Sequence, residues 1–245
     1  MDFNYNNYHV RLLDNNNKDE LLEVQKLRYD YLLKEFNKDL PDGGIDDDGY
    51  DKYCESILII DTTINKIIGT YRIATLRTIK DAKFKTEGEF NCDAIRSCGK
   101  EIIELGRAVV HQDYRNGVII QLLWAAIFEY AQEYDCKYLF GTCSFHGVDP
   151  SIYGNLLCYL KKNYVTNLDV YAVCNSYEFD YLDNYDEAKV RDEMLGLVKS
   201  YLSFNCKFAR NGYIDYEFNS CDVLTIVDMD DCNQRILQRM KRFVQ

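Results

Sequence analysis

The spacing of apolar residues along the chain follows two periods, one typical of helices and one typical of strands. Steps of three and four residues predict amphipathic helices over residues 19–36, 118–134, 149–162, 187–204 and 232–243. Runs of apolar, partly β-branched residues predict strands over 8–13, 56–61, 66–76, 102–110, 137–145 and 222–228. Strands and helices are therefore interspersed, which indicates an α/β (α+β) class.

Two charged residues interrupt the predicted strand 102–110. They are Glu104 and Arg107, and burying an ion is costly unless it is paired or used. The polar turn 113–117 follows, and then the helix that begins near Val118. A strand, a charged turn and a helix in this order often present a site at the end of the strand. A purely structural Glu–Arg pair is the alternative that this stretch leaves open.

Two further arginines lie at apolar positions. Arg28 belongs to the apolar stripe of the first helix, and Arg72 lies inside an apolar strand. For Arg28, snorkelling is the alternative to a functional role. The loop 40–53 is dense in acid and glycine and contains Asp48 and Asp51. It lacks the ligand spacing of an EF-hand, so we expect it to hold a buried arginine or a substrate amine rather than calcium.

The composition argues against several classes of function. A net charge of −11 disfavours nucleic acid, which needs a basic surface. The ten cysteines include no Cys-x-x-Cys and the three histidines are scattered, so we expect reduced thiols and no metal site. Neither a secretory signal nor an apolar run of membrane-spanning length is found, which predicts a cytoplasmic protein. No linker interrupts the chain, so residues 1–245 are expected to form one domain, with a core over 8–165 and a C-terminal portion over 166–245.

Six short motifs follow one another along the chain. They are Leu27-Arg28-Tyr29, Asp48-Gly49-Tyr50-Asp51, Gly69-Thr70-Tyr71-Arg72, Glu104-Leu105-Gly106-Arg107, His111-Gln112-Asp113-Tyr114-Arg115 and Gly141-Thr142-Cys143-Ser144-Phe145. In this order they resemble the ornithine-lipid and N-acyl amino acid synthases, which are related to the acyl-homoserine-lactone synthases. The resemblance implies a GNAT-like acyltransferase fold, with a central mixed twisted sheet flanked by helices and a C-terminal helix-strand-helix extension.

The same resemblance implies an acyl thioester as donor and no tightly bound cofactor. GNAT proteins that bind acetyl-coenzyme A typically carry Arg/Gln-x-x-Gly-x-Gly/Ala before a helix whose N–H groups bind pyrophosphate. Here Arg115, Asn116 and Gly117, the expected donor contacts, are followed by the bulky Ile119 and Ile120. This departure favours phosphopantetheine on acyl carrier protein over acyl-coenzyme A.

An acidic carrier protein would need a basic surface on this acidic chain. The candidates are the segment from Lys80 to Lys85 and the last predicted helix, which carries Arg235, Arg239, Lys241 and Arg242. A peripheral contact with the inner face of the membrane is a further expectation for this protein.

The implied reaction is attack of an amine on the thioester. Glu104 is the expected base, because a buried carboxylate has a raised pKa; Arg107 is expected beside it, and His111 is the rival base. The expected substrate contacts, whether to the acidic loop or to an acceptor carboxylate, are Arg28, Asp48, Asp51, Arg72, Cys143 and Ser144. No Gly-x-Ser-x-Gly surrounds Ser144, so covalent catalysis is not expected.

The predicted function is therefore acyl transfer from acyl carrier protein to the primary amine of an amino acid or a related small amine. Two alternatives stay open: a lactone-forming synthase that uses S-adenosylmethionine, and a non-catalytic module that binds a carrier protein or a membrane surface. The acceptor, the acyl chain length and the oligomeric state do not follow from the sequence.

Overall fold

A computed structural model describes residues 1–36, 40 and 42–244, and the chain divides into two compact units. The first unit consists of residues 1–82, 103–136 and 234–245, and the second of residues 83–102 and 137–233. Pro41, which belongs to the predicted acidic loop, lies outside the described residues. The prediction of one domain with a core over 8–165 and a C-terminal portion over 166–245 stays a prediction.

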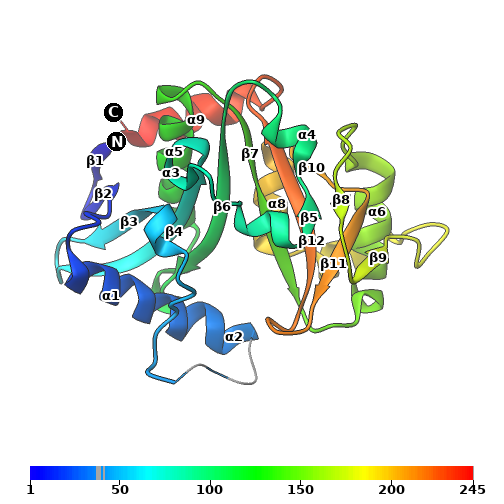
Figure 1. Ribbon diagram of the computed structural model, residues 1–245, viewed down its shortest axis with the longest axis horizontal. Helices are drawn as coiled ribbons and strands as arrows, with labels where there is room; N and C mark the ends of the chain where they lie inside the picture. The colour runs from blue at the N-terminus through cyan, green and yellow to red at the C-terminus, as the bar shows by residue number, and fades with distance from the viewer. Residues whose placement is uncertain (37–39, 41, 245) are drawn as a thin grey trace. The chain divides into compact units, whose positions relative to one another are not determined.

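An antiparallel sheet forms the centre of the first unit (Figure 1). Its strands pair in the order β1 (Asp2–Tyr5), β2 (Tyr8–Leu12), β3 (Glu55–Asp61), β4 (Lys66–Thr75) and β6 (Glu101–Val110). The predicted strands and the hairpin of β3 and β4 are confirmed. The pattern did not predict β1, which pairs with β2 at the edge of the sheet.

Helices of the first unit pack on both faces of this sheet. On one face, Val24 and Leu27 pack against Leu58 and Ile60 of β3. On the other face, α5 approaches β4 so closely that a Cβ on Gly69 would lie 2.6 Å from Cγ2 of Ile119. A strand covered on both faces is apolar at successive positions, as β3 is. The helical segments are α1 (Lys18–Arg28), η1 (Tyr29–Leu33), α2 (Lys34–Phe36), η2 (Asp51–Tyr53), α3 (Leu76–Ile79), η4 (Gln112–Tyr114), α5 (Val118–Glu133) and α9 (Gln234–Val244).

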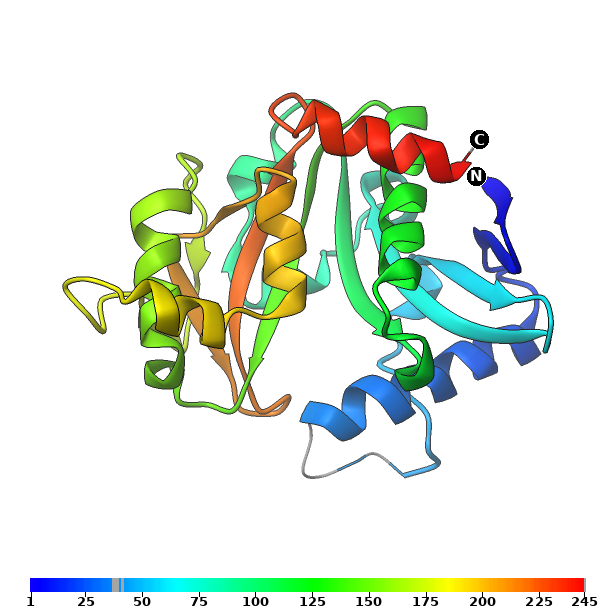
Figure 2. The ribbon, with the colours of Figure 1, turned by 180° about the vertical axis from the view of Figure 1, so that it is seen from behind.

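The second unit has its own antiparallel sheet. Its strands pair in the order β7 (Cys136–His146), β12 (Ser220–Asp228), β11 (Asn211–Asp215) and β9 (Ser176–Glu178), and β10 (Lys207–Phe208) also pairs with β12. A small separate pair is formed by β5 (Phe90–Asn91) and β8 (Tyr171–Ala172). The helical segments are η3 (Lys85–Gly88), α4 (Asp93–Arg96), η5 (Pro150–Tyr153), α6 (Gly154–Tyr164), α7 (Glu187–Glu193) and α8 (Gly196–Ser203). Figure 2 shows both units from behind.

Two helix predictions need correction. The first helix begins at Lys18 rather than Asp19, because the side chain of Asn17 accepts a hydrogen bond from the N–H of Glu20 and caps it. The helix predicted over 187–204 is two helices, α7 and α8, separated at Met194 and Leu195, which have extended backbones. The predicted α/β (α+β) class, with sheets flanked by helices, is confirmed.

The helices within residues 1–36, 40 and 42–244 are each too short or too polar to cross a membrane.

Candidate active site

Three arginines and three aspartates of the first unit form one buried ion cluster. Arg28 is the last residue of α1, Arg72 lies in β4 and Arg107 in β6. The loop between α2 and β3 supplies the carboxylates of Asp46, Asp48 and Asp51. Three positive and three negative charges therefore offset one another inside the protein, as buried ions require.

Arg28 is the most deeply buried of the arginines, with 0% of its surface exposed. Its Nη1 and Nη2 donate to the two carboxylate oxygens of Asp51 at 2.8 and 2.6 Å. Nη2 also donates to the backbone oxygen of Asp46 at 2.8 Å, and Nε lies 3.0 Å from Oδ2 of Asp46. The snorkelling alternative for Arg28 is therefore wrong, because the guanidinium ends in the core and not at the surface.

Arg72 and Arg107 bind the other oxygens of the same loop. Arg72 donates from Nη1 and Nη2 to the two oxygens of Asp48 at 2.8 and 2.9 Å, a bidentate pair, and from Nη1 to Asp51 at 3.2 Å. Arg107 donates from Nε to Asp46 at 2.9 Å and from Nη2 to Asp48 at 3.4 Å. Each aspartate thus contacts two arginines. The loop is therefore held by six arginine–aspartate contacts, which Arg28, Arg72 and Arg107 make.

The electrostatics of the cluster follow from this geometry. Burial alone would raise the pKa of Asp48, but the hydrogen bonds and charge of Arg72, together with Arg107, hold that pKa well below its ordinary value. Asp51 behaves in the same way, because Arg28 outweighs its burial and holds its pKa below the ordinary range. Burial of the Arg72 side chain would lower the pKa of Arg72, but the hydrogen bonds and charge of Asp48 raise that pKa above its ordinary value. All three side chains are therefore charged at neutral pH.

Arg107 lies in a bulge of β6. Thr70 of β4 pairs with Val109, whereas Arg72 pairs with Gly106, so Arg107 and Ala108 together lie opposite the single residue Tyr71. Arg107 has a φ of +54°, which is unfavourable for a side chain other than glycine. Such strain persists where surrounding contacts enforce it, and the pairs with Asp46 and Asp48 are contacts of that kind.

Glu104 lies three residues before the bulge and pairs in register with Ala74. Glu104 is 5% exposed, so its side chain is buried inside the protein. Glu104 acts on the Cys54 thiol: burial raises the pKa of Cys54 to about 12, and the charge of Glu104 acts in the same direction. Glu104 therefore lies in the buried region next to the ion cluster.

His111 lies at the end of β6 and starts the turn η4. Its Nδ1 accepts from the N–H of Asp113 at 3.3 Å, so the neutral ring carries its proton on Nε2 and donates it to the hydroxyl of Tyr31 at 2.7 Å. Both ring nitrogens have partners within the protein. This arrangement favours His111 as a residue that stabilises the turn over His111 as a base.

The family described as the acetyltransferase (GNAT) domain matches residues 27–125, which contain the whole ion cluster. The matched residues form part of a chain of 245 residues. Its fold is similar to that of a solved CoA-dependent acyl-homoserine lactone synthase, BjaI, with MTA: the TM-score is 0.55 over 96% of this chain and 89% of that chain, at 12% identity. The predicted GNAT-like fold is confirmed.

Proteins named L-ornithine N(alpha)-acyltransferase are similar to this chain over most of its length. That of Rhodobacter capsulatus is 24% identical over 241 residues, which cover 93% of this chain and 92% of the relative. That of Agrobacterium fabrum is 27% identical over 238 residues, which cover 90% of this chain and 81% of the relative. The resemblance inferred from the short motifs is confirmed.

The turn that precedes α5 is the GNAT segment in which donor contacts were predicted. Arg115 donates from Nε to the backbone oxygen of Val110 at 3.0 Å, and its Nη2 lies 2.5 Å from the carboxylate of Glu35. Asn116 accepts the N–H of Val118 at 3.0 Å, and Gly117 has a φ of +90° at the start of α5. The structure thus shows these residues shaping the turn, and their contact with a donor stays a prediction.

Cys143 and Ser144 lie in β7 of the second unit. Cys143 is 1% exposed, and burial raises the pKa of its thiol to about 12, which makes it a poor nucleophile. Ser144 is half-buried and pairs in register with Asp222. Their predicted contact with a substrate stays a prediction.

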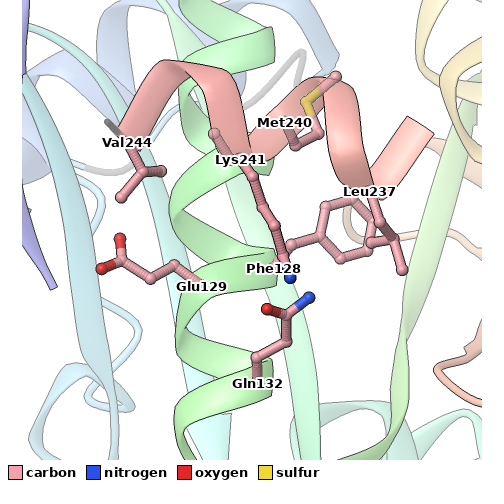
Figure 3. Close-up of a pocket in the computed structure, with 8 residues that line it drawn as sticks. Phe128, Glu129, Gln132, Leu237, Met240, Lys241 and Val244 are labelled. Carbon is pink, nitrogen blue, oxygen red and sulfur yellow. The ribbon is translucent and has the colours of Figure 1, made fainter. Parts of the chain in front are cut away.

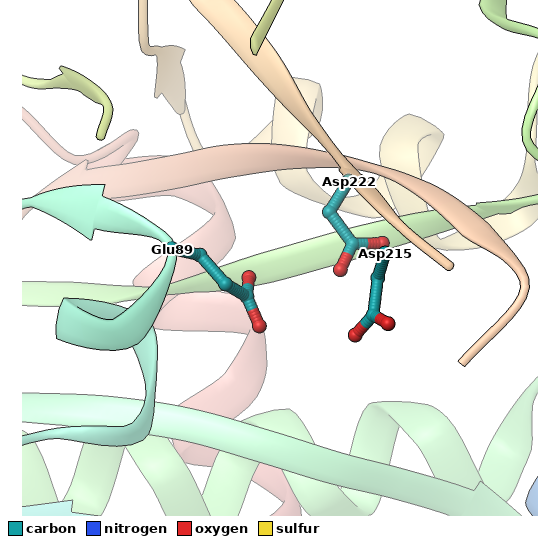
Figure 4. Close-up of side chains that lie close together, drawn as sticks. All are labelled: Glu89, Asp215 and Asp222. Carbon is teal, nitrogen blue, oxygen red and sulfur yellow. The ribbon is translucent and has the colours of Figure 1, made fainter. Parts of the chain in front are cut away.

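The second unit also contains a carboxylate cluster that the sequence did not indicate. Oxygens of Glu89, Asp215 and Asp222 lie within 4.8 Å of one another. Figure 4 shows the three side chains. Asp222 accepts a hydrogen bond from the hydroxyl of Ser220 at 2.8 Å. Of the described side chains, these three are spaced closely enough to hold a metal ion, but carboxylates alone do not identify one.

Three residues of the site were missed from the sequence. Asp46 bridges Arg28 and Arg107, Gln25 donates to Asp51 at 3.0 Å, and Tyr31 bonds to His111. A count of charges was the available signal for Asp46, because three arginines at apolar positions require three carboxylates. Nothing in the local pattern distinguishes Gln25 or Tyr31 from other helix residues.

Proposed function

We propose that this protein is an N-acyltransferase that transfers a fatty acyl group from a thioester to the primary amine of an amino acid. The observation that carries the proposal is the similarity to L-ornithine N(alpha)-acyltransferases over 93% of the chain and 92% of the relative. Ornithine is therefore the first acceptor to test.

The reaction forms an N–C bond and breaks a C–S bond. The amine loses a proton as its nitrogen attacks the carbonyl carbon, and the departing thiolate takes up a proton. Glu104 is our candidate for the base, because it is a buried carboxylate of β6, close to the bulge at Arg107. The bulge frees backbone N–H groups from the ladder, and we assign to them the binding of the tetrahedral oxygen, a role worth about 3 kcal/mol in other enzymes.

The ion cluster has a positioning role in this proposal. The guanidinium groups of Arg28, Arg72 and Arg107 are already engaged by the aspartates of the loop. Binding of an acceptor carboxylate by any of them would require an aspartate to leave, which is costly for a buried pair. We therefore assign the cluster to holding the bulge of β6 in place, and the acceptor carboxylate to other groups.

Acyl carrier protein is our proposed source of the thioester. In support, the first turn of α5 carries Val118 and Ile120 at the two positions where the pyrophosphate-binding motif, counted from Arg115, has small residues. Arg115, which could neutralise a phosphate, already pairs with Glu35. A carrier-bound phosphopantetheine has one phosphate where coenzyme A has three, so it demands less of this turn.

The test is product analysis with purified components. Wild-type protein, acyl carrier protein charged with a 3-hydroxyacyl or a saturated acyl chain, and ornithine are expected to yield an amide that mass spectrometry identifies. Glu104→Gln is expected to lower kcat/KM roughly 100-fold or more, because it removes the base and keeps the shape. Glu101→Gln, on the same strand, is the matched control.

Three outcomes would reject parts of the proposal. Near-normal turnover by Glu104→Gln would remove Glu104 as base. Equal rates with acyl-coenzyme A would remove the carrier protein as the preferred donor. A lactone formed from S-adenosylmethionine, with no amide from amino acids, would replace the function itself.

A further inference from the structure

Helix α9 differs in charge from the rest of the protein. The chain has a net charge of −11, yet Gln234–Val244 contains Arg235, Arg239, Lys241 and Arg242 and no acidic residue. A strongly basic segment on an acidic protein creates a local field of opposite sign. That field determines which kind of surface can approach this side of the first unit.

The apolar face of α9 is already used within the first unit. Leu237 and Met240 are buried, and with Val244 they pack toward Phe128 of α5, leaving a shallow pocket of about 190 Å³ between the two helices (Figure 3). Phe243 packs edge-on against Tyr5, with ring centroids 5.0 Å apart. The helix is therefore held on the protein by its apolar side and cannot insert that side elsewhere without unpacking.

The opposite face of α9 is a stripe of arginines. Arg235, Arg239 and Arg242 are spaced i, i+4 and i+7, which places them on one side of a helix, and all three are exposed. We call these three residues the arginine stripe. Arg239 donates to the neutral amide of Gln121 at 3.0 Å, a contact that fixes the side chain and leaves its charge uncompensated.

Helix α5, which packs against α9, carries the acidic residues Glu129 and Glu133. Glu129 of α5 lines the pocket beneath the apolar face, and an oxygen of Glu133 lies 3.8 Å from the terminal nitrogen of Met1. Lys241 extends over this pocket toward Gln132 (Figure 3). The stripe is exposed, whereas Glu129 of α5 lies in the pocket beneath the apolar face of α9.

We propose that the arginine stripe binds an anionic phospholipid surface. A protein–protein interface usually needs apolar anchor residues at its centre. The exposed side chains of α9 are arginine, lysine and glutamine only. A lipid surface requires nothing but charge, and clusters of basic residues on one helix face are attracted to it by about 1 kcal/mol for each residue, which is about fivefold in affinity. The proposal is independent of the proposed reaction.

Vesicle binding of the full-length protein tests the proposal. Vesicles of phosphatidylcholine containing about a third of phosphatidylglycerol are expected to sediment the protein at low salt, and vesicles of phosphatidylcholine alone are not. The triple variant Arg235→Gln, Arg239→Gln and Arg242→Gln is expected to bind roughly 100-fold more weakly. Binding of the wild type is expected to fall as salt is raised, because screening shortens the range of the field.

A second triple variant separates the stripe from net charge. Lys18→Gln, Lys66→Gln and Lys189→Gln remove the same charge from exposed lysines on other elements and are expected to leave vesicle binding within about twofold of the wild type. Equal losses in both variants would overturn the assignment to α9. So would equal binding to neutral and anionic vesicles, or a stripe variant that loses affinity for an acidic carrier protein while its vesicle binding is unchanged. Vesicles are tested without substrate, so failure of amide synthesis is a separate result.

Discussion

Arg28 shows what the ion cluster requires of its residues. A guanidinium with 0% exposure has lost its hydration and is stable only if its donors meet oxygens inside the protein. Asp51 and Asp46 provide those oxygens, and both also serve a second arginine. Removal of one member therefore leaves a charge without its partner, and the effects of single substitutions are expected not to add.

Asp46→Asn is expected to destabilise the protein by about 3 kcal/mol, because it leaves Arg28 and Arg107 without one of their carboxylates in the core. Urea unfolding measures the loss. The neighbouring Asp47 is exposed and only bonds to the N–H of Gly49, so Asp47→Asn is the control and is expected to change stability by less than about 0.5 kcal/mol. Similar losses in the two variants would contradict the bridging role of Asp46.

Arg107→Lys is expected to lower activity more than stability. Lysine keeps the charge and the same unfavourable φ, but its single ammonium cannot reach Asp46 and Asp48 with the geometry of a guanidinium. We expect kcat/KM for amide formation to fall roughly 10-fold or more while the unfolding free energy changes by about 1 kcal/mol. A variant with normal kcat/KM would show that the bulge does not depend on the fork of Arg107.

The charged members of the site could be predicted from single positions, and their partners could not. Arg28, Arg72, Glu104 and Arg107 stand out because each interrupts an apolar pattern. The hydrogen bond of His111 joins it to Tyr31, 80 residues away, and such a pairing depends on how η1 packs against the end of β6. Periodicity contains no information on that distance, so His111 was named only as a rival base to Glu104, and its hydrogen bond to Tyr31 was not predicted.

At the scale of elements, the bulge of β6 determines what the strand can do. Its apolar run predicted a strand, but the place where two residues oppose one follows from pairing with β4 and not from the run itself. The short strand β5 escaped prediction for a related reason, since two residues show no period. Long elements with a clear apolar face, α5 and β12 among them, were predicted nearly to their ends.

Substitutions at two glycines of the first unit separate effects on packing from effects on activity. A Cβ on Gly69 would lie 2.6 Å from Ile119, so Gly69→Ala is expected to cost about 1–3 kcal/mol through overpacking of α5 on β4. A Cβ on Gly106, beside the bulge, would meet no atom within 4 Å. Gly106→Ala is therefore expected to keep the unfolding midpoint and to lower kcat/KM, because the methyl group enters space that we assign to the reacting groups.

Thermal unfolding and amide synthesis, measured on both glycine variants, check this pair of expectations. Gly106→Ala with full activity would place the reacting groups away from Gly106. A stable Gly69→Ala would show that α5 can withdraw from β4 at little cost.

At the scale of the whole molecule, the ion cluster makes stability depend on pH. The pKa values of Asp48 and Asp51 are lowered in the folded state, so their contribution to the unfolding free energy is complete above the unfolded pKa of about 4. It is lost as the pH falls below that value toward the folded pKa. We expect the unfolding free energy to decrease in this acidic window, as measured by urea titrations at successive pH values.

The variant Asp48→Asn measures how much of the pH dependence of the unfolding free energy comes from the ion cluster. Arg72 keeps Asp51 and Arg107 keeps Asp46 in this variant, so a folded protein is expected. Its unfolding free energy is expected to change less steeply below pH 4, by up to about 1.4 kcal/mol per pH unit for one proton. Parallel slopes for the variant and the wild type would assign the acid sensitivity to other carboxylates.

The segment η1 (Tyr29–Leu33) is a π-helical turn between α1 and α2, and it contains one residue more than a regular helix would need. Arg28 before it reaches the acidic loop, whereas Tyr31 within it and Glu35 after it reach His111 and Arg115. Deleting a single residue there would restore an ordinary helix and rotate the later side chains by about 100° relative to Arg28. The extra residue thus determines the angle about the helix axis between Arg28 and the later side chains of Tyr31 and Glu35. A change of length at this point would separate these side chains from their partners without altering any residue that makes contact.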